Sequence, residues 1–263
     1  MIVRRRPLGA AEVGTMEHQL ASHFMSNIAE TMKRQKVVIE QDKDGISYCE
    51  GDLLHSVASR DGISLAPYIH ALYGVVRQAR ARRVLMIGCG GGTLATMLTR
   101  AGVAITLVDN DPQSFALARN YFRLPQTVVC AVSDGAAFLR QTRHRYDAIV
   151  LDAYAKGRVP RHLVTAAFFA LEKSRLARGG LLAMNVMVKD DDDRAPDRIV
   201  YRLKEIFRQV RLLDEEGESD RNALVMAGPV RGIKRPRLLL RPRKGAGTVA
   251  AGLKALEFRA PRP

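Results

Sequence analysis

The sequence is poor in cysteine and has no long apolar run. Its three cysteines, Cys49, Cys89 and Cys130, lie far apart and without C-x-x-C spacing. This spacing argues against a disulfide framework and against a zinc site. No apolar stretch approaches the roughly 20 residues needed to cross a bilayer, and no apolar signal core follows the first arginines. We therefore expect a globular, cytoplasmic protein without membrane contact.

Acidic residues are also scarce. The chain has 42 lysines and arginines against 27 acids, a net charge of +15 over 263 residues. Residues 231–263 hold ten of the basic residues and one acid, so this segment alone carries +9. Its prolines and glycines predict an extended, flexible basic tail. A solvated tail is the favoured interpretation, and contact with a polyanion such as RNA is the alternative.

From Val84 onward, strand and helix patterns alternate with short connections, which is typical of a doubly wound parallel α/β sheet. Seven strands are predicted, and the last two must pair antiparallel because the turn between them is too short for a crossover helix. The predicted strands are 84–87, 104–108, 127–132, 146–151, 181–186, 210–213 and 223–226. The layout is that of S-adenosylmethionine-type transferases, and we assign residues 81–230 to such a domain.

Residues 1–80 are predicted to form a small β-containing cap in front of this domain. A loosely periodic helix is expected over 11–34, and a helix with one apolar face over 64–79. Between them, β-branched residues flank a turn at Gly45, which predicts a hairpin over 37–49.

A glycine cluster follows the first strand of the main domain. Gly88, Gly90 and Gly92 leave backbone N–H groups free to approach a ligand, as strand-to-helix turns do for nucleotides. A dinucleotide fingerprint would have glycine at position 93, where this chain has Thr93. The cluster therefore favours an S-adenosyl ligand over a dinucleotide.

Carboxylates follow the next three strands, at the edge where such sheets bind ligands. Asp109 is predicted to accept the ribose hydroxyls, while Asp111 caps the following helix. Asp134, followed by Gly135, is predicted to meet the adenine amino group, with helix capping as the alternative. Asp152 leaves a buried strand and is predicted to orient or deprotonate a nucleophile, with an ordinary loop carboxylate as the alternative.

Several segments resemble the spermidine synthase (polyamine aminopropyltransferase) family over about 56–187. The glycine cluster resembles the family's glycine motif, and the stretch beginning at Tyr68 resembles its tyrosine-led helix. The segments Ser133–Leu139 and Tyr146–Asp152 resemble its two most specific motifs. The resemblance implies that Asp152 is the amine-activating residue and that Tyr68 and Tyr154 lie at the substrate site.

The chain departs from that family at three acidic positions. Gly91, Ala155 and His70 stand where the resemblance predicts carboxylates that bind a cationic amine. Asp190, Asp191, Asp192 and Asp193 follow the fifth strand and offer acids near the site, for an amine or for a divalent metal. A solvated loop is the favoured interpretation of this run, and no metal is expected.

The resemblance and the residues together predict a transferase that moves an alkyl group, aminopropyl or methyl, from an S-adenosyl sulfonium donor to a nucleophile. The donor is S-adenosylmethionine or its decarboxylated form. The alternatives are a methyltransferase with an unknown acceptor and a catalytically lapsed module that binds nucleoside or RNA. The sequence names no acceptor and leaves a homodimer open.

Overall fold

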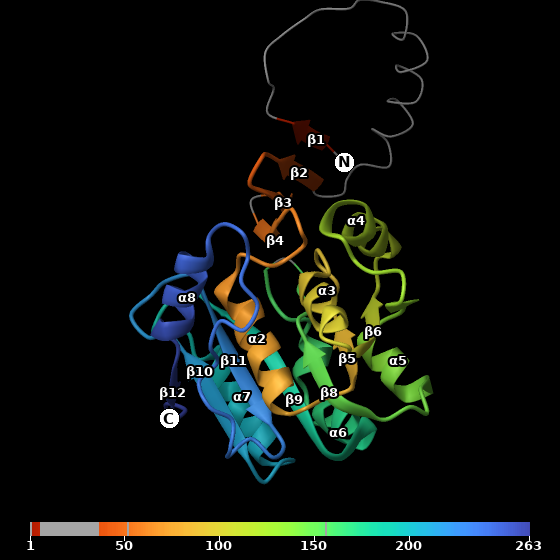
Figure 1. Cartoon of the computed structure of the whole chain (residues 1–263). Coiled ribbons are helices and arrows are strands. Elements are labelled where there is room, and N and C mark those ends of the chain that lie inside the picture. Colours follow the sequence, from red (N-terminus) through yellow and green to blue (C-terminus); the bar gives the residue numbers. More distant parts are fainter. Residues whose placement is uncertain (1, 6–36, 52, 156) are drawn as a thin grey trace, which may run out of the picture.

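The computed structural model describes residues 2–5, 37–51, 53–155 and 157–263. A large mixed sheet flanked by helices forms the body of the molecule, and a small sheet lies at one end of it (Figure 1). The helix predicted over 11–34 lies outside the described residues. None of the helices in the described ranges is long and apolar enough to cross a membrane.

The large sheet has eight strands in the order β12-β10-β11-β9-β8-β5-β6-β7. The neighbours from β9 to β7 are parallel, and the pairs β9–β11, β11–β10 and β10–β12 are antiparallel. The strands are β5 (Arg83–Ile87), β6 (Ala104–Asp109), β7 (Val129–Val132), β8 (Tyr146–Leu151), β9 (Leu176–Val188), β10 (Val210–Asp214), β11 (Arg221–Ala227) and β12 (Glu257–Arg259). All seven predicted strands are confirmed, and so is the antiparallel pairing of the last two; β12 is an eighth strand that the sequence analysis missed.

Alternation along β5 explains the layers. Val84 and Met86 face one apolar core, whereas Leu85 and Ile87 face the other, because successive strand side chains point to opposite faces. The first core lies under α2, α3, α4 and α8, and the second under α5, α6 and α7. The helices are α2 (Pro67–Gln78), α3 (Thr93–Arg100), α4 (Pro112–Phe122), α5 (Gly135–Gln141), α6 (Ala166–Arg175), α7 (Ala195–Lys204) and α8 (Ala246–Ala255), with a short 3₁₀ turn η1 (Arg161–Val164) before α6.

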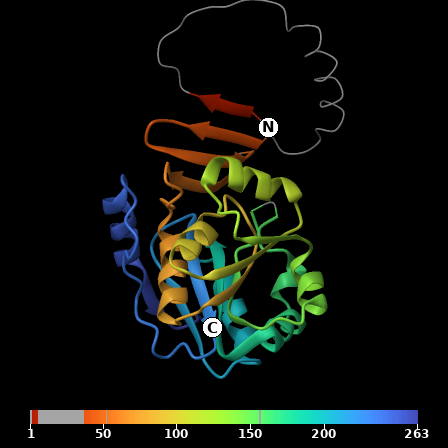
Figure 2. The same ribbon diagram turned by 45° about the vertical axis from the view of Figure 1, so that its right-hand side comes forward.

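The cap is a four-stranded sheet that rests on α4 (Figure 2). Its strands are β1 (Ile2–Arg5), β2 (Val37–Gln41), β3 (Gly45–Glu50) and β4 (Leu53–Ser59). The predicted hairpin is β2–β3, which pair antiparallel. Ile39 and Tyr48 bury their side chains with Phe122 of α4. The helix α2, which the sequence analysis placed in the cap, instead packs in the main core through Leu72 and Val76.

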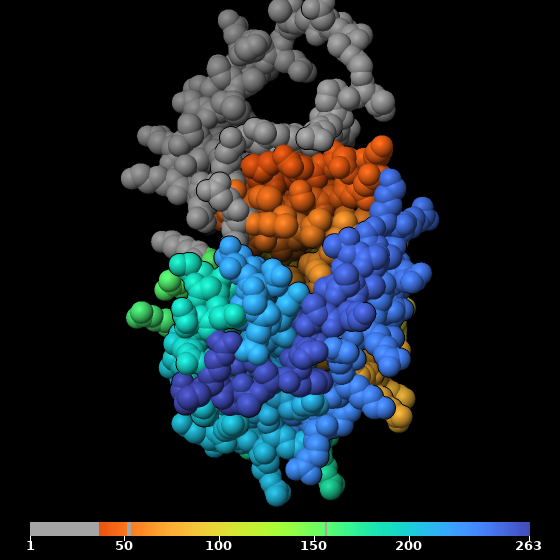
Figure 3. Space-filling model, turned by 90° about the vertical axis from the view of Figure 1, so that its left-hand side faces the viewer, coloured from red at the N-terminus to blue at the C-terminus, as the bar shows by residue number. Residues whose placement is uncertain are grey.

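The C-terminal segment is folded onto the main domain, contrary to the expected flexible tail. Val249 and Leu253 of α8 are buried in the first core, and β12 pairs with β10. Figure 3 shows the segment lying across one face of the molecule and reaching the cap. Composition misled the sequence analysis here because buried side chains are interspersed among the charges.

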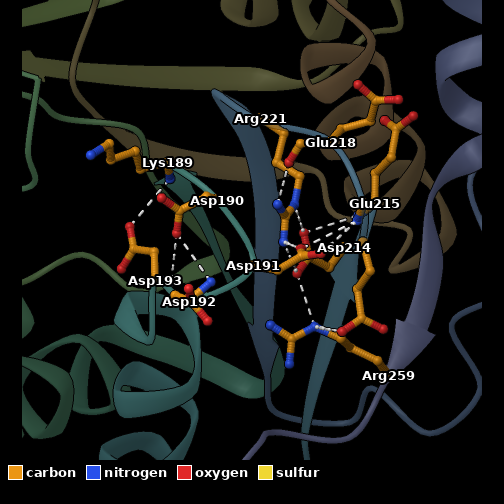
Figure 4. Close-up of polar contacts among 12 residues, drawn as sticks. Lys189, Asp190, Asp191, Asp192, Asp193, Asp214, Glu215, Glu218, Arg221 and Arg259 are labelled. Carbon is orange, nitrogen blue, oxygen red and sulfur yellow. Dashed lines mark hydrogen bonds and ion pairs between the residues drawn. The ribbon is translucent and has the colours of Figure 1, made fainter.

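A network of buried ion pairs fastens the end of this segment (Figure 4). Arg259 contacts Asp197 at 2.6 Å and Asp214 at 2.9 Å. Arg221 holds the other side of Asp214, also at 2.9 Å. Both carboxylates are almost fully buried, Asp214 at 1% and Asp197 at 2% exposure. Burial opposes the ionised form of Asp214, yet the two arginines outweigh it and hold its pKa below the usual range.

Replacing Arg259 by methionine is expected to lower the free energy of unfolding by about 3 kcal/mol. The change leaves Asp197 buried without its guanidinium, while Asp214 keeps Arg221, so the loss lies at the low end for a broken buried pair. Chemical denaturation measures it. The matched control is Arg237→Met, an exposed arginine expected to cost about 0.5 kcal/mol or less. Equal losses in the two variants would show that the network does not hold the segment.

Candidate active site

A cavity of about 1170 Å³ opens at the edge where β5, β6 and β8 end. The cap, α2 and the β10–β11 turn also line it, so it lies between the two sheets. Ligand sites of doubly wound sheets occur at this edge, next to the point where the strand order reverses, which here is between β5 and β8. The volume exceeds that of most small-molecule pockets, about 300–1,000 Å³, and leaves room for two ligands.

Gly88 is required by the way the two central strands meet. A Cβ built on Gly88 would lie 2.1 Å from the carbonyl oxygen of Asp152, and its φ is +100°. The Asp152 amide in turn donates to the Ile87 carbonyl at 2.9 Å. Gly88 and Gly90 line the cavity, whereas Gly92 occupies the N-cap position of α3 and is not among the lining residues. The glycine cluster thus brings the end of β5 against the end of β8.

Gly91 shows why one predicted carboxylate is absent. Its amide donates to Ser56 Oγ at 2.7 Å, and an added Cβ would lie 2.8 Å from Ser56 Cβ and 3.0 Å from Phe122 Cδ1. The cap strand β4 therefore occupies the space that a side chain at position 91 would need.

Asp109 is held in place by main-chain groups. Its two carboxylate oxygens accept hydrogen bonds from the amides of Cys89 at 2.8 Å and Asp111 at 2.9 Å. Burial raises the pKa of Asp109 above its usual value, although both amides counteract the rise. Each oxygen keeps lone pairs for a further donor. Asp111 accepts the Gln113 amide at the start of α4, which confirms its predicted capping role.

Asp134 has two partners already. One oxygen accepts the Ala137 amide and caps α5, and the other lies 2.7 Å from His162 Nε2. Burial alone would raise the pKa of Asp134, but the amide and His162 reverse this and lower it. Gly135 lies against β5, where a Cβ would come within 2.5 Å of Ile87. Both residues line the cavity, with capping as an observed role of Asp134.

Asp152 is a half-buried carboxylate that lines the cavity at the end of β8. Burial raises its pKa to about 6, and a hydrogen bond from Asn185 Nδ2 to Oδ1 at 2.8 Å partly offsets the rise. Asn185 was not predicted from the sequence; it is 2% exposed, and its Oδ1 has no hydrogen-bond partner among the described residues. A lone amide inside the otherwise apolar strand Leu181–Val188 is the signal that could have revealed it.

The two predicted tyrosines line the cavity in different ways. The Tyr154 hydroxyl is hydrogen-bonded to the main chain of β9: it donates to the Asn185 carbonyl at 2.9 Å and accepts from the Met187 amide at 3.0 Å. The hydroxyl therefore holds the loop after β8 against β9. Tyr68 lies at the start of α2, where burial chiefly and the charge of Asp152 secondarily raise its pKa well above the usual value. The structure thus brings Tyr68, Asp152 and Asn185 together.

The cavity is acidic although the protein is basic. Among the described residues seven carboxylates line it, and the one arginine of this lining, Arg221, is already paired with Asp214 and Asp191. Besides the predicted acids, they include Glu50 of the cap and Glu215 and Asp220 of the β10–β11 turn, which the sequence analysis did not name. The local field therefore favours cationic ligands, opposite to what the net charge suggests.

The four consecutive acids form a turn that leads into α7, whose N-cap residue is Arg194. Asp190 accepts the amides of Asp192 and Asp193, and Asp193 accepts the Ala195 amide. Asp191 pairs with Arg221 at 2.9 Å (Figure 4). None of the four lines the cavity. Within the described ranges no group of three or more potential ligands is arranged to hold a metal ion.

Gly91→Ala is expected to destabilise the protein by about 1–3 kcal/mol, because the new Cβ overpacks against Ser56 and Phe122. Thermal unfolding measures the loss. Gly232→Ala is the control, since nothing lies within 4 Å of a Cβ built there. A Ser56→Gly change in the same chain is expected to recover part of the loss. A Gly91→Ala protein as stable as the Gly232→Ala protein would refute the crowding.

Asn185→Ala is expected to raise the pKa of Asp152 above about 6, because it removes a hydrogen bond that stabilises the ionised carboxylate. Carboxyl ¹³C NMR of aspartate-labelled protein follows this titration directly. Asn222→Ala, which removes an amide from the same cavity but none bonded to Asp152, serves as the control. An unchanged or lower pKa in Asn185→Ala would contradict the assigned hydrogen bond.

The amino-acid sequence of the chain matches a known protein family. Residues 56–219 match the model of the methyltransferase small domain. The chain is 30% identical over 167 residues to a polyamine aminopropyltransferase of Neisseria meningitidis, covering 61% of this chain and 62% of that protein. It is 29% identical over 152 residues to an N-terminal histidine N-methyltransferase of Emericella nidulans, covering 56% of this chain and 27% of that protein. The chain thus matches less than two thirds of each relative's length.

Solved structures confirm the fold. A probable spermidine synthase of Corynebacterium glutamicum superposes with a TM-score of 0.68 at 20% identity, over 86% of this chain and 87% of that one. Human methyltransferase-like protein 13, solved with SAH, superposes with a TM-score of 0.51 at 22% identity, over 76% of this chain and 91% of that one. At these identities the likeness concerns the fold alone. With its matched region spanning more than half of the sequence, the chain belongs to the methyltransferase small domain family.

Proposed function

We propose that the protein transfers an alkyl group from an S-adenosyl sulfonium donor to a nitrogen nucleophile. The observation that carries the proposal is Asp152: a half-buried carboxylate beside the glycine loop, whose pKa burial raises to about 6 and which accepts a hydrogen bond from Asn185. At neutral pH such a carboxylate is mostly ionised yet basic enough to take a proton from an attacking amine.

The residues of the cavity fit the donor. The main chain at Gly88 and Gly90 would lie along its methionine-derived portion, and Asp109 would accept the ribose hydroxyls with the lone pairs its two amides leave free. Asp134 and Gly135 would lie at the adenine, where Asp134 shares its carboxylate with His162. The acidic lining also suits the positive charge of a sulfonium.

The reaction depends more on how the protein orients the donor and the acceptor than on chemical activation of the donor. A sulfonium makes the carbon attached to it electrophilic, so the new C–N bond forms as the C–S bond breaks and a neutral thioether leaves. The nitrogen gives its proton to Asp152. Holding donor and acceptor in line, with the base in hydrogen-bond reach, is the main contribution the protein makes.

Aminopropyl and methyl transfer are both compatible with this site. The lining acids from the cap and the β10–β11 turn, Glu50, Glu215 and Asp220, favour a cationic acceptor, as the aminopropyltransferase relatives suggest. Methyl transfer is favoured by the absent amine-binding carboxylates: Ser56 fills the space at Gly91, and His70 is buried with its Nε2 on the Ser64 carbonyl. Only Ala155 of the three positions lines the cavity.

Parallel calorimetric titrations with S-adenosylmethionine, its decarboxylated form and methylthioadenosine distinguish these reactions. Tight binding of the decarboxylated form alone would support aminopropyl transfer, and preference for the carboxylated form would support methyl transfer. Binding by none of the three would refute the proposal.

Asp152→Asn is expected to lower turnover by about 10²–10⁴-fold, because the amide cannot take the proton, while the donor affinity stays unchanged. Mass spectrometry measures the alkylated product with two acceptors, putrescine and a peptide that begins with histidine. Asn222→Ala controls for a substitution in the same cavity. Full turnover by Asp152→Asn, with either acceptor, would exclude Asp152 as the base.

A further inference from the structure

A row of exposed cations runs along the C-terminal segment before α8. We call it the basic strip, and its members are Arg231, Lys234, Arg235, Arg237, Arg241 and Arg243. The composition of residues 231–263 made this charge visible in the sequence, but the structure shows that it is displayed on an ordered surface (Figure 3).

Alternating burial orients the strip. Pro236 and Pro242 are buried, and Leu238 and Leu240 pack against the first core, whereas the arginines between them are exposed. The inner side thus anchors the segment, while the outer side carries the charge. In extended chain, alternate residues recur about every 6.6 Å on one side.

The strip is fastened to α2. The Gln78 side chain exchanges two hydrogen bonds with the main chain of Lys234, at 2.8 and 2.9 Å. Pro236 packs on Gly74, where an added Cβ would come within 2.9 Å of it. These contacts fix the strip beside the exposed arginines at the end of α2, Arg77 and Arg80, so that two elements contribute to one positive surface.

Most of these cations have no acidic partner in the described part of the chain. Of the six strip side chains, only Arg235 lies near a carboxylate of the described residues, 3.5 Å from Glu257. Arg259 and Arg262, in the same C-terminal segment, are instead paired with acids. The segment therefore contains two kinds of arginine. Some pair with acids and fasten the segment to the main domain, and others face solvent without a neighbouring carboxylate of the described residues.

We propose that the basic strip binds the phosphate backbone of double-stranded nucleic acid. Unneutralised arginines and lysines in a row release counterions when they meet a regular line of phosphates, and this release drives sequence-independent binding. The strip has no aromatic side chain on which unpaired bases could stack. Leu239 is its one exposed large apolar residue, which is little for insertion into a membrane. The surface is also separate from the acidic cavity, which would repel phosphates.

The test measures binding of the full chain to a fluorescent duplex of about 20 base pairs, as DNA and as RNA, by anisotropy over roughly 0.05–0.2 M salt. The variant combines Arg237→Ala, Arg241→Ala and Arg243→Ala. It is expected to bind at least about 10-fold more weakly near 0.1 M salt, and the slope of log affinity against log salt is expected to fall by about 2.7, at about 0.9 for each lost phosphate contact. All three side chains are exposed and make no ion pair or hydrogen bond with the described residues, so the fold is expected to stay intact.

A control variant separates local contact from net charge. Arg140→Ala, Arg143→Ala and Arg178→Ala together remove the same charge from exposed positions outside the basic strip. Equal weakening by the two triple variants would overturn the proposal, because the effect would then be that of total charge. Failure of the unmodified protein to bind either duplex at about 0.05 M salt would also overturn it, as would strip-dependent binding to anionic phosphatidylserine vesicles without duplex binding. Strip-dependent binding to either duplex would support it.

Discussion

The close approach of β5 and β8 is the constraint on which the site depends. Only a residue without a side chain fits at Gly88, where a Cβ would meet the Asp152 carbonyl at 2.1 Å. The Asp152 amide bonds to the Ile87 carbonyl across the same contact. This contact places the carboxylate of Asp152 beside the glycine loop and leaves the cavity above both strands. Any larger residue at position 88 would separate the strand ends and move the carboxylate away.

Charge is segregated between two surfaces of one small protein. Seven carboxylates of the described residues line the cavity, whereas the excess of basic residues is displayed on the outside. Desolvation then acts on the acids within: burial raises the pKa of both Asp109 and Asp152, and main-chain amides or Asn185 limit the rise. A cationic donor and a basic protein are therefore compatible, since the field that a ligand meets is set by the residues nearest to it.

The C-terminal segment connects these two surfaces. Its end is fixed by Arg259 between the buried Asp197 and Asp214, and Gly252 and Leu256 of the same segment line the cavity. Between these points the basic strip faces solvent. A segment that looks like a polar appendage by composition thus completes the large sheet, closes one side of the cavity and displays the unneutralised charge.

The sequence by itself determined the succession of strands and helices along the chain, the glycine loop, and the carboxylates Asp109, Asp134 and Asp152 at strand ends. These features could be predicted because apolar runs and the residues that directly follow them are local properties of the sequence. Only the tertiary structure decided what lies across from them. Asn185 reaches Asp152 from a neighbouring strand, and Ser56 fills the space at Gly91 from the cap. The ordered tail likewise depends on Arg259 meeting acids more than 40 positions away in the chain. Such contacts join residues distant in sequence, and no local pattern records them.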